Sequence, residues 1–171
     1  MNTIVLRIAD FLKNSPPFSF LTHKEQILVA QSIRVAYFDV GETIFPFGKT
    51  IQDIFYLVKE GAVGLYAEND QLAAACDEGD IFGLRALIRQ GRYKLAAKAT
   101  EETLLYIIPS AVYQQIISKN PAATAFIVQN FANNLIRIKE DPLGYPLAQA
   151  TRLEEELTAQ YSKNPVTCSA H

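Results

Sequence analysis

The chain has few of the side chains that perform catalysis or hold metals. It contains two cysteines, two histidines, one methionine and no tryptophan. Cys76 and Cys168 lie far apart in unlike segments, so they do not indicate the disulfide framework of a small secreted domain. His23 and His171 lie outside the segment with strand-like spacing, whereas a metal-binding barrel needs histidines and carboxylates inside it. We therefore expect neither a disulfide nor a metal site.

The chain also lacks an excess of positive charge and any long apolar run. Its 16 Lys and Arg residues face 18 Asp and Glu residues, which gives a formal net charge of -2, whereas binding to a phosphate backbone usually depends on a cationic surface. Arg7 and Asp10 interrupt the first apolar stretch, and no segment reaches the roughly 18 apolar residues of a membrane span. We expect a cytoplasmic protein that binds neither nucleic acid nor membrane.

Motifs of the common enzyme classes are missing as well. The sequence has no glycine-rich phosphate loop, and its Ser, His, Asp and Cys residues form no nucleophilic set with workable placement. Glu101 and Glu102 are adjacent carboxylates, but neighbouring residues of a strand point to opposite faces, so a solvated turn is the better interpretation. We expect no enzymatic activity and no cofactor.

The N-terminal residues have the spacing of two helices. Apolar residues from Ile4 to Leu12 recur on one helix face, and Pro16-Pro17 cannot continue that helix. The run Thr22-His23-Lys24-Glu25 has the form of a capping box. It predicts a second helix that reaches about Arg34.

Residues 35–108 change to the spacing of strands. Short segments rich in β-branched and aromatic residues alternate with turn residues and have no long helix between them, a pattern typical of a sandwich, roll or barrel. The predicted strands are Tyr37 to Val40, Thr43 to Phe45, Ile54 to Val58, Ala62 to Tyr66, Gln71 to Ala75 and Thr103 to Ile107.

The C-terminal part returns to helical spacing. Pro109 is suited to the first position of a helix, where its missing N–H costs nothing, and this helix is expected to end before Asn120-Pro121. A second apolar stripe then continues to Ile138, with members at Ile127, Phe131 and Leu135. Its width suits packing on the roll and on a second subunit, so we expect a homodimer through the 124–139 helix.

Glycines fall at positions that point to one family. Gly41, Gly48, Gly61, Gly64, Gly79-Asp80 and Phe82-Gly83 match the landmarks of the cyclic nucleotide-binding domain in order and approximate spacing. The chain resembles that family over residues 11–138. The resemblance implies an α+β, mainly β fold: a double-stranded β-helix or jelly-roll-like β-roll with N-terminal and C-terminal helices, occupying residues 1–140.

Within that family, the chain most resembles the regulatory domain at the front of bacterial proteins that continue into CBS domains and a nucleotidyltransferase-like region. Residues 141–163 are expected to form a linker and an amphipathic helix. Residues 164–171, with Asn164-Pro165-Val166-Thr167-Cys168, resemble the first strand of a CBS domain. Downstream CBS and nucleotidyltransferase-like modules of the same polypeptide are therefore the expected partners in signalling.

The same resemblance locates a ligand site that departs from the family pattern. Ligand-binding members place a Glu for the ribose hydroxyl where this chain has Leu84. Their phosphate-binding Arg aligns with Tyr93 without a gap, or with Lys94 after a one-residue shift. The candidate ligand-binding residues of this degenerate pocket are Phe82, Gly83, Leu84, Arg85, Ala86, Tyr93, Lys94 and Leu95.

Two functions remain open at this point. In the first, the chain is a non-catalytic regulatory domain that transmits a signal, with a degenerate nucleotide site that does not bind cyclic AMP or cyclic GMP tightly. In the second, it is a sensor for an atypical nucleotide or another small anion, bound by Arg85 and Lys94. The cations Arg85, Arg89, Arg92, Lys94 and Lys98 fall in one stretch, which favours either an anion site or a solvated face.

Overall fold

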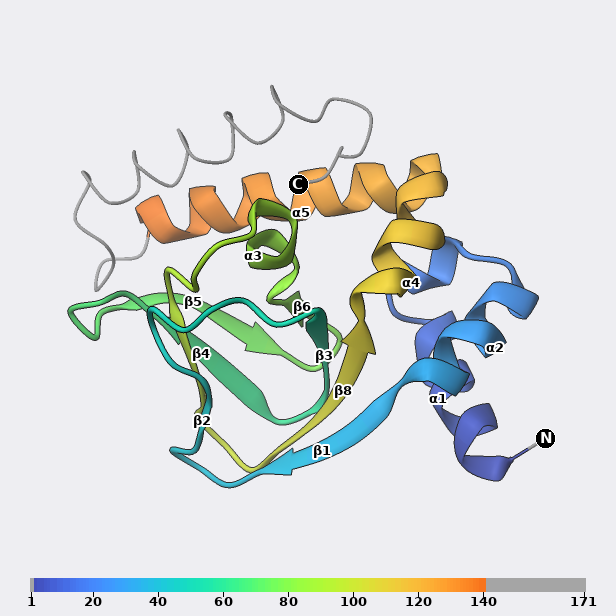
Figure 1. Ribbon diagram of the computed structural model, residues 1–171, viewed down its shortest axis with the longest axis horizontal. Coiled ribbons are helices and arrows are strands. Elements are labelled where there is room, and N and C mark those ends of the chain that lie inside the picture. The colour runs from blue at the N-terminus through green and yellow to red at the C-terminus, as the bar shows by residue number, and fades with distance from the viewer. Residues whose placement is uncertain (1, 141–171) are drawn as a thin grey trace.

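Two four-stranded antiparallel sheets, flanked by helices at both ends of the chain, make up the structure (Figure 1). The computed structural model describes residues 2–140, of which 132–140 are described as helix backbone. The expected linker and helix at 141–163 and the CBS-like strand at 164–171 lie outside the described residues. No helix in this described part has the length and apolarity that crossing a bilayer requires.

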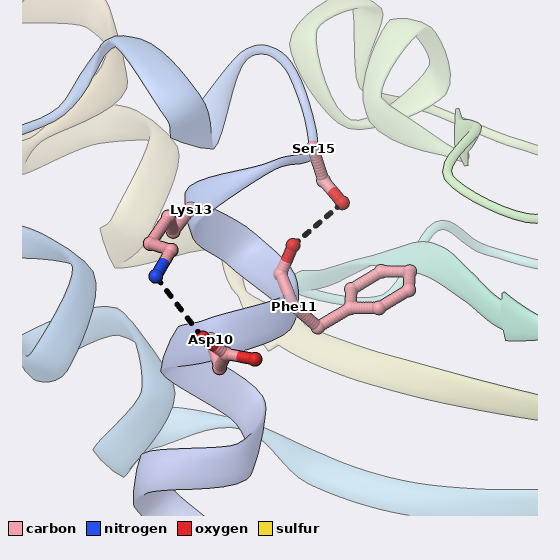
Figure 2. A network of polar contacts seen from close by, with 4 residues as sticks. All are labelled: Asp10, Phe11, Lys13 and Ser15. Atoms are coloured by element: carbon pink, nitrogen blue, oxygen red, sulfur yellow. Dashed lines mark hydrogen bonds and ion pairs between the residues drawn. The ribbon is translucent and has the colours of Figure 1, made fainter.

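The first helix ends where the prolines predict. α1 (Thr3–Lys13) is capped by Asn2, whose side chain accepts a hydrogen bond from the Ile4 amide at 2.7 Å. Figure 2 shows its last turn, where the buried Ser15 hydroxyl donates to the Phe11 carbonyl at 2.8 Å and Lys13 pairs with Asp10 at 3.2 Å. The Phe11 carbonyl also accepts from the Asn14 amide at 3.2 Å, so Ser15 adds a second donor at the end of the helix.

The predicted capping box is confirmed. The Thr22 hydroxyl accepts from the Glu25 amide at 3.1 Å, and the Glu25 carboxylate accepts from the Thr22 amide at 2.9 Å. The helix that it starts, α2 (His23–Ser32), ends earlier than predicted, because Ile33 is already extended (φ -79°, ψ 139°). Arg34 does not belong to the helix; it begins the first strand and pairs with Ile107.

The two sheets contain all the predicted strands; Thr43–Phe45 and Ala62–Tyr66 have the predicted bounds, and the others have shifted ends. The first sheet has the order β1 (Arg34–Phe38), β8 (Thr103–Pro109), β3 (Ile54–Glu60) and β6 (Ile81–Phe82). The second has the order β2 (Thr43–Phe45), β7 (Ala96–Ala99), β4 (Ala62–Tyr66) and β5 (Leu72–Asp77). The mainly β fold with flanking helices is therefore confirmed.

The first strand lies three residues before its predicted start, for a local reason. Residues 39–42 form a turn instead of continuing the strand: the Glu42 amide donates to the Asp39 carbonyl, and the Glu42 carboxylate accepts from the Asp39 amide, both at 3.0 Å. Gly41 has a φ of 85° in this turn, a value that glycine adopts without a Cβ clash.

Two apolar cores lie on opposite faces of the first sheet. Alternate residues of β3 divide between them: Phe55 and Leu57 belong to a core shared with the helices, and Tyr56 and Val58 belong to a core inside the roll. This division follows from the two-residue period of a strand. We call the first the helix-facing core and the second the roll interior.

The sheets join at a sharp corner between β3 and β4. Gly61 occupies it with a φ of 97°, and a Cβ there would lie 2.3 Å from the Glu102 carbonyl oxygen. The buried Thr103 hydroxyl lies beside it, 3.2 Å from the Ala62 amide and 3.1 Å from the Ala62 carbonyl. Only a residue without a side chain fits this corner unless the backbone moves.

The C-terminal helices are α4 (Ser110–Gln115), the short η2 (Ile117–Lys119) and α5 (Pro121–Glu140). The prediction that Pro109 begins a helix is wrong: Pro109 ends β8 in an extended conformation (φ -64°, ψ 148°). Pro121 takes the first helical position instead, and the Asn120 side chain caps α5 by accepting from the Ala123 amide at 2.9 Å. α5 then runs across the roll (Figure 1).

Candidate functional site

A cavity of about 130 Å³ lies between the roll, the short helix α3 (Leu84–Arg89) and α5. We call it the α3 cavity. Figure 1 shows α3 held between the strands and α5. One water needs about 10–15 Å³ of such space, so the cavity has room for a small organic molecule.

All of the predicted ligand-site residues line this cavity. The tertiary structure brings together two segments that are separate in the sequence, residues 82–86 and 93–95. The binding of a ligand by these residues remains a prediction. Their common location makes the α3 cavity the candidate site.

Leu84, the first residue of α3, is a buried aliphatic residue at the position where the resemblance expects a ribose-binding Glu. Gly83 precedes the helix with a φ of 80°, and a Cβ on it would lie 3.2 Å from the Tyr56 ring. Leu84 is 1% exposed and belongs to the helix-facing core. An aliphatic side chain accepts no hydrogen bond, so a ribose hydroxyl placed against it would lose its water partners without replacement.

Tyr93 occupies the second decisive position as part of an aromatic cluster. Its ring is 2% exposed and stacks on Phe45 with centroids 3.8 Å apart, while its hydroxyl accepts from the Gln52 amide at 3.4 Å. Burial raises the pKa of Tyr93 above its ordinary value. The side chain therefore stays neutral at physiological pH and supplies no charge to an anion.

A second stacked pair extends the aromatic wall. Tyr56 and Phe82 lie face to face with centroids 4.8 Å apart, and Phe82 lies 6.2 Å from Phe45. Burial also raises the pKa of Tyr56, which is 3% exposed. Phe45 and Phe82 line the cavity together with Tyr93, so its wall offers π faces and apolar surface.

The run of cations noted in the sequence divides between the cavity and the surface around it. Arg85, Arg89 and Lys94 line the cavity. Arg92 instead donates to the Gly48 carbonyl at 2.9 Å, and Lys98 lies 5.7 Å from the centre of the Tyr66 ring. None of the described residues that line the cavity is acidic. The cavity thus combines an apolar body with positive charge.

Sequence reasoning missed the opposite wall of the cavity. β4 and β5 supply small and apolar residues there, and α5 closes the site. The pattern of β5 predicts a strand but gives no sign that its inward residues border an opening, because burial against a cavity and burial against protein require the same residue types. The unpredicted lining residues are Phe45, Leu65, Ala73, Ala74, Cys76, Ile81, Arg89, Asn130 and Phe131.

A separate polar cluster lies on the surface of β1. The Tyr37 hydroxyl lies 2.9 Å from an Asp39 carboxylate oxygen and 3.1 Å from one of Glu102. The hydrogen bond with Asp39 is the main cause that raises the pKa of Tyr37 to about 12. This cluster does not line the α3 cavity. Across residues 2–140, no three His, Cys, Asp or Glu residues come together as a metal site would require.

Comparison with known proteins places most of the two sheets in a known domain family. A family model described as cyclic nucleotide-binding domain matches residues 35–120, which is half of the chain. The matched segment runs from β1 to the end of η2 and includes α3 and the segments on either side of it.

Solved structures share the architecture at low sequence identity. The cAMP-bound PfPKA-R structure is 17% identical, with a TM-score of 0.68 over 81% of this chain and 49% of that one. The sensor domain of the transcriptional regulator DNR from Pseudomonas aeruginosa is 20% identical, with a TM-score of 0.64 over 81% of this chain and 95% of that one. The regulatory domain of PKA from Toxoplasma gondii, crystallised with cAMP, is 20% identical, with a TM-score of 0.66 over 76% of this chain and 50% of that one. The chain thus spans about half the length of two of these structures.

Proposed function

This chain belongs to the cyclic nucleotide-binding domain family, and from that premise we propose that it is a non-catalytic regulatory domain with a degenerate nucleotide site. The family consists of regulatory and sensor domains. In this chain, the side chains that would hold a sugar phosphate have been replaced, so regulation proceeds without tight binding of cyclic AMP or cyclic GMP.

The observation that carries this proposal is the burial of Leu84 and Tyr93 in the two cores. Leu84 is 1% exposed and Tyr93 is 2% exposed, so neither side chain can turn away to make room for a polar partner without disrupting packing. An unsatisfied ribose hydroxyl at Leu84 would cost about 1–3 kcal/mol. The phosphate would also lack a bidentate guanidinium at position 93, and Lys94 offers only a point charge.

Calorimetric titration of the chain with cyclic AMP and with cyclic GMP tests the proposal. We expect no saturable heat at micromolar concentrations of protein and nucleotide. A thermal melt of the same sample shows that the protein is folded. Micromolar or tighter binding of either nucleotide would contradict the proposal.

The position of α5 supports a role in signal transmission. Asn130 and Phe131 line the α3 cavity, so anything that fills or reshapes the cavity touches the helix that leads toward residues 141–171. We propose that α5 transmits the state of the cavity to the C-terminal side. We further propose, from the resemblance of residues 164–171, that CBS and nucleotidyltransferase-like modules of a longer bacterial polypeptide receive it. The coding sequence beyond His171 checks this: its translation should contain a CBS pair.

Homodimerisation through the 124–139 helix is a further part of the proposal. Ile127 is fully buried and Phe131 is 8% exposed within the helix-facing core of the same chain, so these two residues face inward. The side chains of Leu135 and Ile138 lie outside the described part. Sedimentation should give a mass that rises with concentration toward the dimer. A monomer mass at every concentration would remove dimerisation from the proposal.

A second function, an anion sensor, is favoured by one specific observation. Three cations and no described acidic residue line the α3 cavity. A regulatory domain that has lost cyclic nucleotide binding can retain this positive site for a different anion, and the shape of the cavity restricts which anion that is.

A further inference from the structure

We propose that the α3 cavity binds a compact organic anion whose body is a single aromatic ring and whose charge is a carboxylate. This inference rests on the proposed function, because it assigns a ligand class to the same site once cyclic nucleotides are excluded. Three properties of the cavity lead to it: the composition of its wall, the sign of its charge and its size.

The residues that line the α3 cavity favour a ligand whose uncharged part is apolar. Its aromatic members are Phe45, Phe82, Tyr93 and Phe131, and its larger aliphatic members include Leu65 and Leu84. A sugar placed against these side chains would exchange hydroxyl–water hydrogen bonds for contacts that cannot accept or donate. An aromatic ring has no such hydroxyls and gains offset or edge contacts with the stacked pairs in the wall.

The charge selects an anion. Arg85 is half-buried at the start of α3, and Lys94 lies on the facing loop, where its neighbour Tyr93 is fixed by backbone hydrogen bonds. Arg89, which donates to the Arg92 carbonyl at 2.6 Å, adds a third positive charge to the cavity lining. Positive groups beside an apolar wall act through a lower effective dielectric than in water, which strengthens their attraction for an anion.

The volume of the α3 cavity suits a ligand whose uncharged part is about one ring. The cavity measures about 130 Å³, and an apolar cavity of about 150 Å³ holds a benzene molecule. A benzoate-sized or phenylacetate-sized acid fits the α3 cavity, with the ring toward the aromatic wall and the carboxylate toward Arg85 and Lys94.

Titration of the 171-residue chain with phenylacetate, its neutral analogue phenylacetamide, and cyclic AMP tests the inference. We expect phenylacetate to raise the melting temperature by mass action. Because a charge-assisted hydrogen bond is lost, phenylacetamide should bind at least about tenfold more weakly. The ring is the same in both compounds, so this difference isolates the carboxylate.

Variants locate the site. Arg85→Gln and Lys94→Gln should each weaken phenylacetate binding several-fold, whereas Lys24→Gln, an exposed cation on α2 outside the cavity lining, should leave it unchanged. Ala74→Phe fills the cavity from β5 and should abolish binding. Lys94 is exposed, so Lys94→Gln keeps the test decisive if the larger substitution impairs folding.

The outcomes separate this inference from the proposed function. Equal binding of phenylacetate and phenylacetamide, unchanged binding in Arg85→Gln and Lys94→Gln, or no binding of phenylacetate at millimolar concentration would each overturn the aromatic-acid assignment. None of these results tests the proposed loss of cyclic nucleotide binding. Micromolar binding of cyclic AMP would overturn the proposed function itself, whatever phenylacetate does.

Discussion

The helix-facing core and the roll interior share the strands β3 and β8 but differ in what they pack against. On one face, Phe55, Leu57 and Ile108 are fully buried against α1, α2 and the C-terminal helices. On the other, Tyr56 and Phe82 belong to an aromatic cluster that borders the α3 cavity. The two faces of one sheet thus differ in kind: aliphatic and aromatic residues pack against helices on one face, and an aromatic cluster contributes Phe45, Phe82 and Tyr93 to the cavity wall on the other.

This comparison explains how a ligand site can change while the fold persists. The helix-facing core packs the N-terminal and C-terminal helices against the sheet, so most of its residues are surrounded by protein. The roll interior borders the cavity, where a substitution can change the cavity wall without opening a new void. Ile81, Leu84 and Phe131 belong to the helix-facing core and also line the cavity.

The largest expected effect compares two phenylalanines of the first sheet. Phe55→Ala removes a fully buried ring of the helix-facing core and should lower the free energy of unfolding by about 3–5 kcal/mol. Phe82→Ala should cost less, because Phe82 already borders the α3 cavity and loses fewer packed neighbours. Urea unfolding at constant m-value measures both. Equal costs would show that the roll interior is as tightly closed as the helix-facing core.

A smaller effect is expected at the corner that joins the two sheets. Gly61→Ala places a Cβ 2.3 Å from the Glu102 carbonyl oxygen at a φ of 97°, and the strain should cost about 1–3 kcal/mol. Gly79→Ala is the matched control, since Gly79 has a φ of 91° and nothing within 4 Å of its Cβ position. The melting temperature of Gly61→Ala should therefore be well below that of Gly79→Ala. Equal melting temperatures would mean that φ alone matters and that the close approach does not.

The smallest effect compares an exposed tyrosine with the buried ones. The pKa of Tyr37 is raised from 10.0 to about 12, mainly by its hydrogen bond with Asp39. Because the folded chain holds this proton more tightly than the unfolded chain, the contribution to stability is complete below about pH 10 and is lost as the pH rises through about 12. Alkaline titration followed by phenolate absorbance should show a step near pH 12 that is absent in Tyr37→Phe.

Asp39→Asn provides the control for that assignment. Removing the carboxylate should return the pKa of Tyr37 toward its ordinary value, because the first cause of the shift is lost. Burial is the first cause of the raised pKa values of Tyr93 and Tyr106, so those tyrosines should titrate unchanged. An unchanged Tyr37 step in Asp39→Asn would assign the shift to its other neighbours.

Local chemistry made parts of this structure predictable from sequence. The capping box at Thr22 and Glu25, the end of α1 before the prolines and the turn glycines depend on neighbours a few residues away. Strand ends were less predictable, because the hydrogen bonds of β1 are made with β8, far along the chain. β6 and the alanine-rich β7 have little strand pattern of their own, and pairing with β3 and β4 makes them strands.

The sequence by itself indicated the family, the helices at both ends of the described chain and the strands other than β6 and β7. It also predicted a site that lacks the family's carboxylate and guanidinium. Those features are readable because they depend on residue identity and short-range spacing. Only the tertiary structure decided that residues 82–86 and 93–95 face one cavity, that Arg92 and Lys98 make other contacts, and that β5 and α5 complete the wall. These are long-range contacts. The type of a buried residue does not show whether protein or open space lies beside it.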